Sequence, residues 1–225
     1  MSSDCYGQCS ESSYPCLFLF STVLEEVLLH DGSTIVVDRS VERGGRHELG
    51  QPPPFKEQSL RFTVPVTSQK LTWEDHFSED LGSANFLPML LDIVKETPYL
   101  VASPMGCLAY NKWGRPNPPY VIFKYNGREW QRIPLEELPS VINTPNLIIS
   151  DPDNKVKELG KSFATASDVK NANTGFRQPE YRTILREAVK GGEGLTSCPD
   201  YNSERYRSPK APLPMKPLND PQGKQ

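Results

Sequence analysis

The sequence predicts a mainly β protein, an antiparallel meander of hairpins that forms a sandwich or a partial barrel, with short helices after residue 151. Two dipeptides, Asp31-Gly32 and Asn126-Gly127, each separate two runs of β-branched or aromatic residues, which is the strongest short-range hairpin signal. Residues 59–77 alternate between apolar and polar side chains, as in a sheet with one buried face. Too few strands are visible for a propeller of several blades.

The first hairpin is expected to begin near Thr22, with a two-residue turn at Asp31-Gly32. The opposite pairs would be Leu28 with Ile35 and Val27 with Val36. Apolar residues fall on both faces near this turn, so we expect both faces to be covered there. Glycines and prolines between residues 44 and 54 predict a loop.

The alternation in residues 59–77 assigns one face to the core. Its members are apolar and share one parity on each strand: Leu60, Phe62, Val64, Leu71, Trp73 and Phe77. Residues 85–101 fit either a short helix or two strands with a turn, and Pro88 and Thr97-Pro98 favour the strands. Residues 102–119 contain several Pro and Gly residues and predict a loop.

The second hairpin is expected within residues 120–134, with a type I′ turn at Asn126-Gly127. Its opposite pairs would be Tyr125 with Arg128, Lys124 with Glu129, Phe123 with Trp130 and Ile122 with Gln131. A short strand is expected at residues 146–150. Residues 153–171 predict one or two short helices, and residues 179–189 fit a returning strand or a last helix.

Three parts of the chain differ in composition. We expect a disordered or misassigned leader at residues 1–21, a single globular domain at 22–190, and a disordered Pro-rich tail at 191–225. The net charge of −3 and the pI near 5.7 argue against nucleic acid as an obligate partner. No stretch reaches the roughly 20 apolar residues of a transmembrane helix. The apolar run at residues 17–24 follows acidic residues rather than Lys or Arg, unlike a secretory signal.

Motifs for catalysis or metal binding are weak. The five cysteines are odd in number and do not imply a disulfide framework, and Cys5 and Cys9 lack a second ligand pair for zinc. The histidines, at positions 30, 47 and 76, do not occur in an HxH or HExxH pattern, so we expect no metal or other cofactor. The acidic run at residues 74–80 is expected to be a solvated strand end.

One polar and aromatic segment is the candidate ligand site, formed by Tyr110, Lys112, Trp113 and Arg115. Aromatic faces beside cationic and amide donors are typical of a surface that binds a sugar or a peptide. The alternative is structural: Trp113 would cap the open end of the sheet, and Arg115 would lie over an aromatic ring and hold the loop. An exposed or a buried Trp113 would distinguish these readings.

Three stretches of the sequence carry a resemblance to a known family: residues 28–40, 99–139 and 180–187. Over roughly residues 24–187 the chain resembles an uncharacterised family of bacterial proteins, many of which begin with an export signal. The resemblance implies a bacterial protein that is periplasmic or secreted. No activity is assigned to that family, so it supplies no catalytic residues, and this chain departs from it at both ends.

These observations favour a non-catalytic bacterial binding or interaction protein with a small glycan or peptide as its ligand. The alternative is a hydrolase acting on a cell-envelope polymer, with the acidic run or Cys107 as its centre. Convergence of Glu74, Glu79 or Asp80 with another carboxylate in a deep cleft would favour the enzyme.

Overall fold

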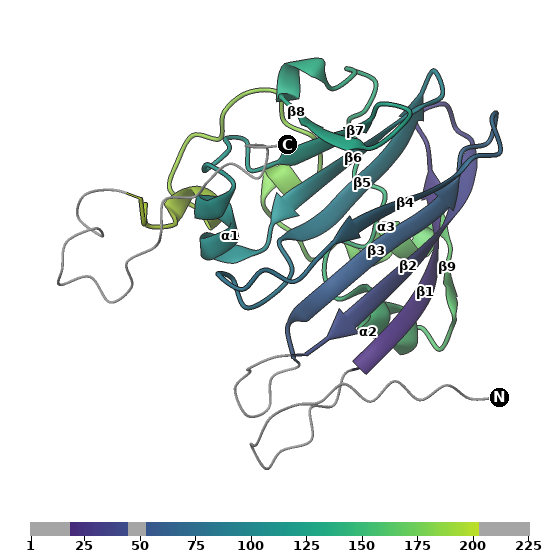
Figure 1. Cartoon of the computed structure of the whole chain (residues 1–225), viewed down its shortest axis with the longest axis horizontal. Helices are drawn as coiled ribbons and strands as arrows, with labels where there is room; N and C mark the ends of the chain where they lie inside the picture. Colours follow the sequence, from purple (N-terminus) through teal and green to yellow (C-terminus); the bar gives the residue numbers. More distant parts are fainter. Residues whose placement is uncertain (1–18, 45–52, 203–225) are drawn as a thin grey trace, which may run out of the picture.

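The computed structural model of this protein describes residues 19–44 and 53–202. Two β-sheets pack face to face to form the sandwich that the sequence predicts (Figure 1). The first sheet has the strand order β4-β3-β2-β1-β9, and the second has the order β5-β6-β7-β8. All neighbouring strands are antiparallel except the short β9, which runs parallel to β1.

The strands of the first sheet are β1 (Leu19–Leu28), β2 (Thr34–Arg43), β3 (Phe55–Thr63), β4 (Lys70–Asp75) and β9 (Phe163–Ala164). Those of the second are β5 (Phe86–Val94), β6 (Thr97–Pro104), β7 (Val121–Tyr125) and β8 (Trp130–Ile133). The helices are α1 (Gly106–Lys112), α2 (Pro152–Glu158) and α3 (Ala166–Ala172). The strands at 85–101 and the short helices after residue 151 therefore confirm the sequence analysis.

The inward face of the first sheet follows the period of two that the sequence shows. Leu60, Phe62, Leu71 and Trp73 are buried as predicted. Phe77 does not join them and is 40% exposed. The reason is that β4 ends at Asp75, so the alternation of the strand no longer governs where Phe77 lies.

The second sheet is buried on both faces. One face packs on the first sheet through residues such as Leu91 and Phe123, whereas Met89 and Ile122 on the other face pack against Ile142 and its neighbours. This explains why the sequence of β5 is a nearly continuous apolar run rather than an alternating one.

The register of the first hairpin differs from the prediction by one residue. Val27 pairs with Ile35, because the turn is a three-residue loop closed by the Leu29 N–H donating to the Ser33 carbonyl. Gly32 takes a positive φ of 85° there. A slip of one residue exchanges the faces, so Val36 is 50% exposed while Ile35 is buried.

The second hairpin differs by two residues. Tyr125 pairs with Trp130, and the Asn126 N–H donates to the Glu129 carbonyl, so that Gly127, at a φ of 95°, is the first central residue of the turn. The Asn126 side chain accepts from two backbone N–H groups beyond it and fixes this arrangement. A shift of two keeps the faces, and Trp130 still packs against the core cluster that contains Phe123.

Three segments of the structure differ from the predicted elements. Residues 102–119 contain the end of β6 and α1 rather than only a loop. Residues 146–149 are buried and Ser150 is exposed, but none of them forms a strand, and residues 179–189 form a single 3-10 turn at Pro179–Tyr181 rather than a strand or an α-helix.

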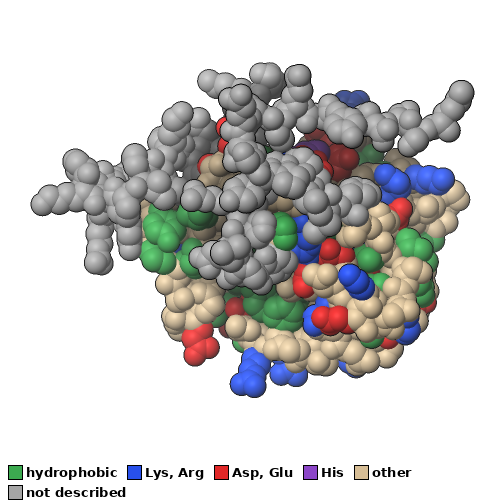
Figure 2. Space-filling model, turned by 90° about the horizontal axis from the view of Figure 1, so that it is seen from below, with side chains coloured by type: hydrophobic (Ala, Val, Ile, Leu, Met, Phe, Trp, Pro, Cys, Tyr) green, Lys and Arg blue, Asp and Glu red, His purple; other side chains and the backbone are tan. Residues whose placement is uncertain are grey.

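The described chain continues through residue 202, past the expected domain end at 190, and Cys198 forms a disulfide with Cys107 on α1. The sequence analysis did not expect this bond. Residues 1–18 and 203–225, with the other three cysteines and the core of the Pro-rich tail, lie outside the described residues, as does His47. Among residues 19–44 and 53–202, the structure contains no helix with the length and apolarity to span a membrane. On the face in Figure 2, basic and acidic side chains of the described residues are intermixed.

Candidate functional site

The four predicted site residues lie on α1 and on the turn that follows it. Tyr110 and Lys112 belong to the helix rather than to a loop. The Arg115 guanidinium donates to the carbonyls of Pro199 and Cys198, each at 2.9 Å, and lies 5.0 Å from the centroid of the Tyr110 ring. The Lys112 ammonium pairs with Asp80 at 2.8 Å.

Trp113 is half-buried against the edge of the core. Its ring centroid lies 4.6 Å from that of Phe86, and its indole N–H donates to the Asn85 side-chain oxygen at 3.2 Å. The Arg132 guanidinium lies over the same indole, 5.6 Å from the ring centroid. These contacts match the structural reading of the segment, in which Trp113 caps the sheet and Arg115 holds the loop over an aromatic ring.

Asn111, which the sequence analysis did not single out, completes this arrangement. It is fully buried, and its amide donates to the carbonyls of Cys107 and Pro199, both at 2.9 Å, while its oxygen accepts from the Tyr201 N–H at 3.0 Å. We call the set of Asn111, Arg115 and the Cys107–Cys198 disulfide the α1 clamp. It fastens residues 198–201 to α1, and its side-chain groups bond to the chain's own backbone carbonyls and N–H groups.

Neither of the centres considered for a hydrolase is assembled. Cys107 is bonded to Cys198, so its sulfur is not a free nucleophile. Within the acidic run, Asp80 pairs with Lys112, and the exposed Glu74 lies 3.7 Å from His76. The described parts of the chain also contain no group of three or more His, Cys, Asp or Glu side chains placed to hold a metal ion.

Asp75, the buried member of the run, is a structural carboxylate. It accepts from the N–H groups of Asn85 and Phe86 and from the side-chain amides of Asn85 and Gln58, at distances of 2.8 to 3.1 Å. Burial raises the pKa of Asp75, and these donors oppose that rise. The carboxylate joins β4 to the start of β5 and faces no open space, since it is only 3% exposed.

A cleft of about 600 Å³ lies at another position, where the β1–β2 hairpin, β5, the segment 141–146 and α3 meet. Its volume falls within the range of small-molecule sites. Its wall combines aliphatic side chains with amide, hydroxyl, imidazole and cationic groups. The lining residues are Leu28, Leu29, His30, Asp92, Val141, Asn143, Thr144, Pro145, Asn146, Ala166, Val169, Lys170, Asn173, Thr174, Tyr181 and Arg182.

A His–Asp pair lines this cleft. Nδ1 of His30 lies 2.7 Å from one Asp92 oxygen, and the His30 backbone N–H donates to the other at 3.1 Å. The Ile93 N–H also donates to Asp92, at 2.7 Å. The Asp92 oxygen accepts in this bond and Nδ1 of His30 donates, so that Nε2 is left without a partner among the described residues. Asp92 is 3% exposed and fully engaged.

Two cations of the cleft are also unengaged. Lys170 and Arg182 are exposed, and neither side chain has a hydrogen bond or an ion pair with the described residues. The only carboxylate of the lining is Asp92, which is occupied by His30. The phenol of Tyr181 adds a neutral hydroxyl, because burial raises its pKa. The cleft thus presents free N–H donors and no free carboxylate.

Buried amides position the cleft wall. Asn146 accepts from the Leu91 N–H at 2.9 Å and donates to the carbonyls of Leu28 and Leu91, which ties the segment 141–146 to both sheets. Asn173 at the end of α3 bonds to the Ile149 N–H and the Leu147 carbonyl. These side-chain bonds supply what a strand would have obtained from a neighbouring strand.

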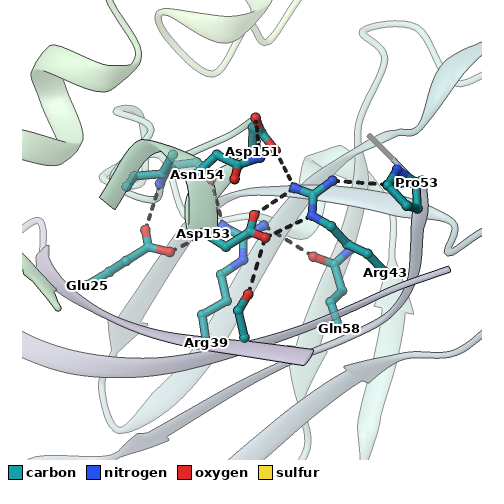
Figure 3. A network of polar contacts seen from close by, with 10 residues as sticks. Glu25, Arg39, Arg43, Pro53, Gln58, Asp151, Asp153 and Asn154 are labelled. Atoms are coloured by element: carbon teal, nitrogen blue, oxygen red, sulfur yellow. Dashed lines mark hydrogen bonds and ion pairs between the residues drawn. The ribbon is translucent and has the colours of Figure 1, made fainter. Parts of the chain in front are cut away.

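A buried ion pair completes this backbone arrangement (Figure 3). Arg39 donates to the Ile148 carbonyl at 2.6 Å and to Glu25 at 3.3 Å, and the Ile148 N–H donates to the other Glu25 oxygen at 2.7 Å. Both side chains are fully buried. Burial raises the pKa of Glu25, while Arg39 beside it opposes the rise. Residues 146–149 are therefore buried without a strand, because side chains bond the backbone groups of Leu147, Ile148 and Ile149.

Figure 3 also shows the contacts of Arg43, which hold the start of α2. Arg43 donates to Asp153 at 2.6 and 2.8 Å and also bonds to Asp151. Asp151 has a positive φ of 59°, and Asn154 donates to it at 3.0 Å. The inward polar residues of β2 thus fix both segments that lead toward α3.

A second groove of about 600 Å³ lies beside β8. Its cations are already used, since Arg186 donates to the carbonyls of Leu138, Pro139 and Ile142 and Arg132 donates to the Trp113 carbonyl. Asn117 is bonded to both backbone groups of Val189. This groove has fewer free polar groups than the cleft at His30.

The fold and site define a β-sandwich with a cleft of mixed polarity beside its β1–β2 hairpin. Comparisons with protein-family models, with curated proteins and with solved structures gave no match. His30 is next to Asp31 in the sequence, but its partner in the structure is Asp92, 62 residues away. No local pattern in the sequence signals that pairing, so the function must be argued from the geometry.

Proposed function

We propose that this chain is a non-catalytic binding protein of bacteria and that the cleft at His30 holds a small ligand such as a short peptide or a glycan. The observation that carries the proposal is the contrast in hydrogen bonding: His30 Nε2, Lys170 and Arg182 line a cleft of suitable size and have no partners among the described residues. Free polar groups on an otherwise apolar wall are the usual means of ligand orientation.

The Cys107–Cys198 disulfide supports a periplasmic or secreted location, which is part of the same proposal. Disulfides persist in oxidising compartments and are rare where glutathione and thioredoxin keep thiols reduced. The bond closes across 91 residues and secures the last described segment, so it is integral to the fold.

A fragment screen by protein-observed heteronuclear NMR tests the proposal. We expect hits to shift the resonances of cleft residues, and we expect Val141→Trp to abolish their binding, because the indole would occupy the cleft from a side chain that is 47% exposed. The matched control is Val66→Trp, at a 74% exposed valine outside the cleft. Hits that bind both variants equally, or that cluster elsewhere, would contradict the proposal.

One observation favours the alternative, a hydrolase acting on a cell-envelope polymer. An imidazole oriented by a buried carboxylate, as in the His30–Asp92 pair, is the arrangement of a general base. The test is whether the protein releases soluble fragments from purified envelope polymer. Release by the parent that is lost in His30→Gln would show that the cleft is catalytic and would contradict a binding function alone.

A further inference from the structure

We infer that the ligand of this cleft carries a carboxylate on an apolar body. The inference rests on the proposed function and names the ligand class of the same site. It follows from three features of the cleft: its N–H donors without partners, its one carboxylate, which is already bonded to His30, and the apolar side chains of the rest of its wall.

The charges of the lining are asymmetric. Lys170 and Arg182 contribute two cationic groups that have no hydrogen bond or ion pair with the described residues. Asp92, the only acid of the lining, already accepts from His30 twice and from the Ile93 N–H. A cation entering the cleft would meet like charges and an occupied carboxylate, whereas an anion would meet free donors.

The donors of the cleft suit a carboxylate. The guanidinium of Arg182 presents a planar fork that matches the two oxygens of a carboxylate, as it also matches a phosphate, and charge-assisted bonds of this kind are roughly twice as strong as neutral ones. The phenol of Tyr181, whose oxygen lies 3.5 Å from the Ser103 hydroxyl, can also donate to an oxygen of the ligand.

The other side chains of the cleft define the rest of the ligand. Leu28 and Val141 are 49% and 47% exposed, and Val169 and Pro145 continue the same wall. Covering such side chains stabilises a complex in proportion to the apolar surface removed from water. An inorganic anion would leave these apolar side chains exposed to water. A ligand with an apolar body beside its carboxylate would contact both the apolar wall and the cationic groups.

Two matched ligand pairs test the inference: hexanoate with hexanamide, and N-acetylleucine with its amide. The second pair represents a peptide C-terminus, and the first represents a simple organic acid, so the tighter pair identifies the source of the carboxylate. Affinities are measured at neutral pH by heteronuclear NMR titration of the full chain. We expect at least one acid to shift cleft resonances and to bind about tenfold more tightly than its amide.

Charge variants locate the effect. Arg182→Gln and Lys170→Gln should each weaken binding of the acid about five- to tenfold and leave binding of the amide unchanged. Arg128→Gln, which removes the same charge from the exposed β7–β8 turn, should change neither. Thermal melts of all three variants should match the parent, since none of these side chains is buried.

The outcomes separate this inference from the proposed function. Equal binding of acid and amide within the cleft would overturn the carboxylate class and leave the binding cleft standing. Failure of both acids to bind would also overturn the carboxylate class. The fragment screen with Val141→Trp would then show independently whether the cleft binds a ligand. Binding of the acid that ignores Arg182→Gln and Lys170→Gln would place the anion site elsewhere.

Discussion

The α1 clamp and the cleft at His30 contain similar residues but use them differently. Each has an arginine and an asparagine, and a tyrosine lies next to each: the Tyr110 ring beside Arg115 of the clamp, and Tyr181 in the lining of the cleft. In the clamp, Arg115 and Asn111 bond to the chain's own carbonyls. In the cleft, the Arg182 side chain has no partner within the described residues. Residue types alone therefore do not identify a binding site, because a side chain that already bonds to the protein's own groups is not free to bind a ligand.

The difference has an energetic consequence. A bonded and buried polar group stabilises the fold only as part of its pair, and removal of one member leaves the other desolvated without compensation. An exposed group without a partner contributes little to stability and can be replaced at little cost. Matched substitutions in bonded and free residues should therefore separate structural from binding roles.

The largest contrast is expected between two arginines. Arg39→Met should lower the free energy of unfolding by about 3–5 kcal/mol, because it leaves buried Glu25 without its counter-ion and the Ile148 carbonyl without a donor. Arg182→Met should change it by less than about 0.5 kcal/mol. Urea unfolding followed by circular dichroism measures both. Equal losses of unfolding free energy in the two variants would show that Arg182 has a structural partner and would contradict its role as a free group of the cleft.

A smaller contrast is expected between two asparagines. Asn111→Ala should cost about 2–3 kcal/mol, because two carbonyls and the Tyr201 N–H lose a buried partner. Asn143→Ala should cost less than about 0.5 kcal/mol, since this exposed side chain accepts only from Thr144. Fragment binding in the cleft should respond to Asn143→Ala and not to Asn111→Ala. The reverse pattern of binding would return the site to the α1 clamp.

The sequence predicts the elements of the sandwich well, because they depend on local patterns. Both hairpins were expected from Asp31-Gly32 and Asn126-Gly127, and the inward face of β3 and β4 follows from alternation. The registers were wrong because the turn type depends on which backbone N–H groups the Asp31 and Asn126 side chains accept from. A strand was wrongly expected at 146–150 because the apolar pattern does not reveal that side chains bond its backbone.

The candidate cleft could not be predicted in the same way. His30 and Asp92 are 62 residues apart, and Cys107 and Cys198 are 91 apart, so both pairings depend on the completed topology. The four predicted site residues were chosen for their chemistry, and that chemistry serves equally well to fasten a loop. Only the partners of Arg115 and Trp113 in the folded chain distinguish the two uses.

The smallest expected effect concerns α3, which carries Lys170 on the cleft wall. Thr165 and Asp168 form a capping box at its start, and the Lys161 ammonium bonds to Asp168 at 2.9 Å. These bonds, first that from Lys161 and then those from Thr165, lower the pKa of Asp168 from 3.8 to about 2. The carboxylate is therefore more acidic in the folded protein than in the unfolded chain.

The sign of the pH dependence follows from this shift. The folded state binds the proton less tightly than the unfolded state, so ionised Asp168 stabilises the fold above pH 4, and this contribution is lost as the pH falls toward 2. Asp168→Asn should lower the unfolding midpoint at pH 6, and the gap between variant and parent should close between pH 4 and 2. Glu158→Gln, at a 66% exposed side chain, is the matched control and should run parallel to the parent. A gap that persists at pH 2 would mean that the capping geometry, and not the charge of Asp168, holds α3 against the cleft.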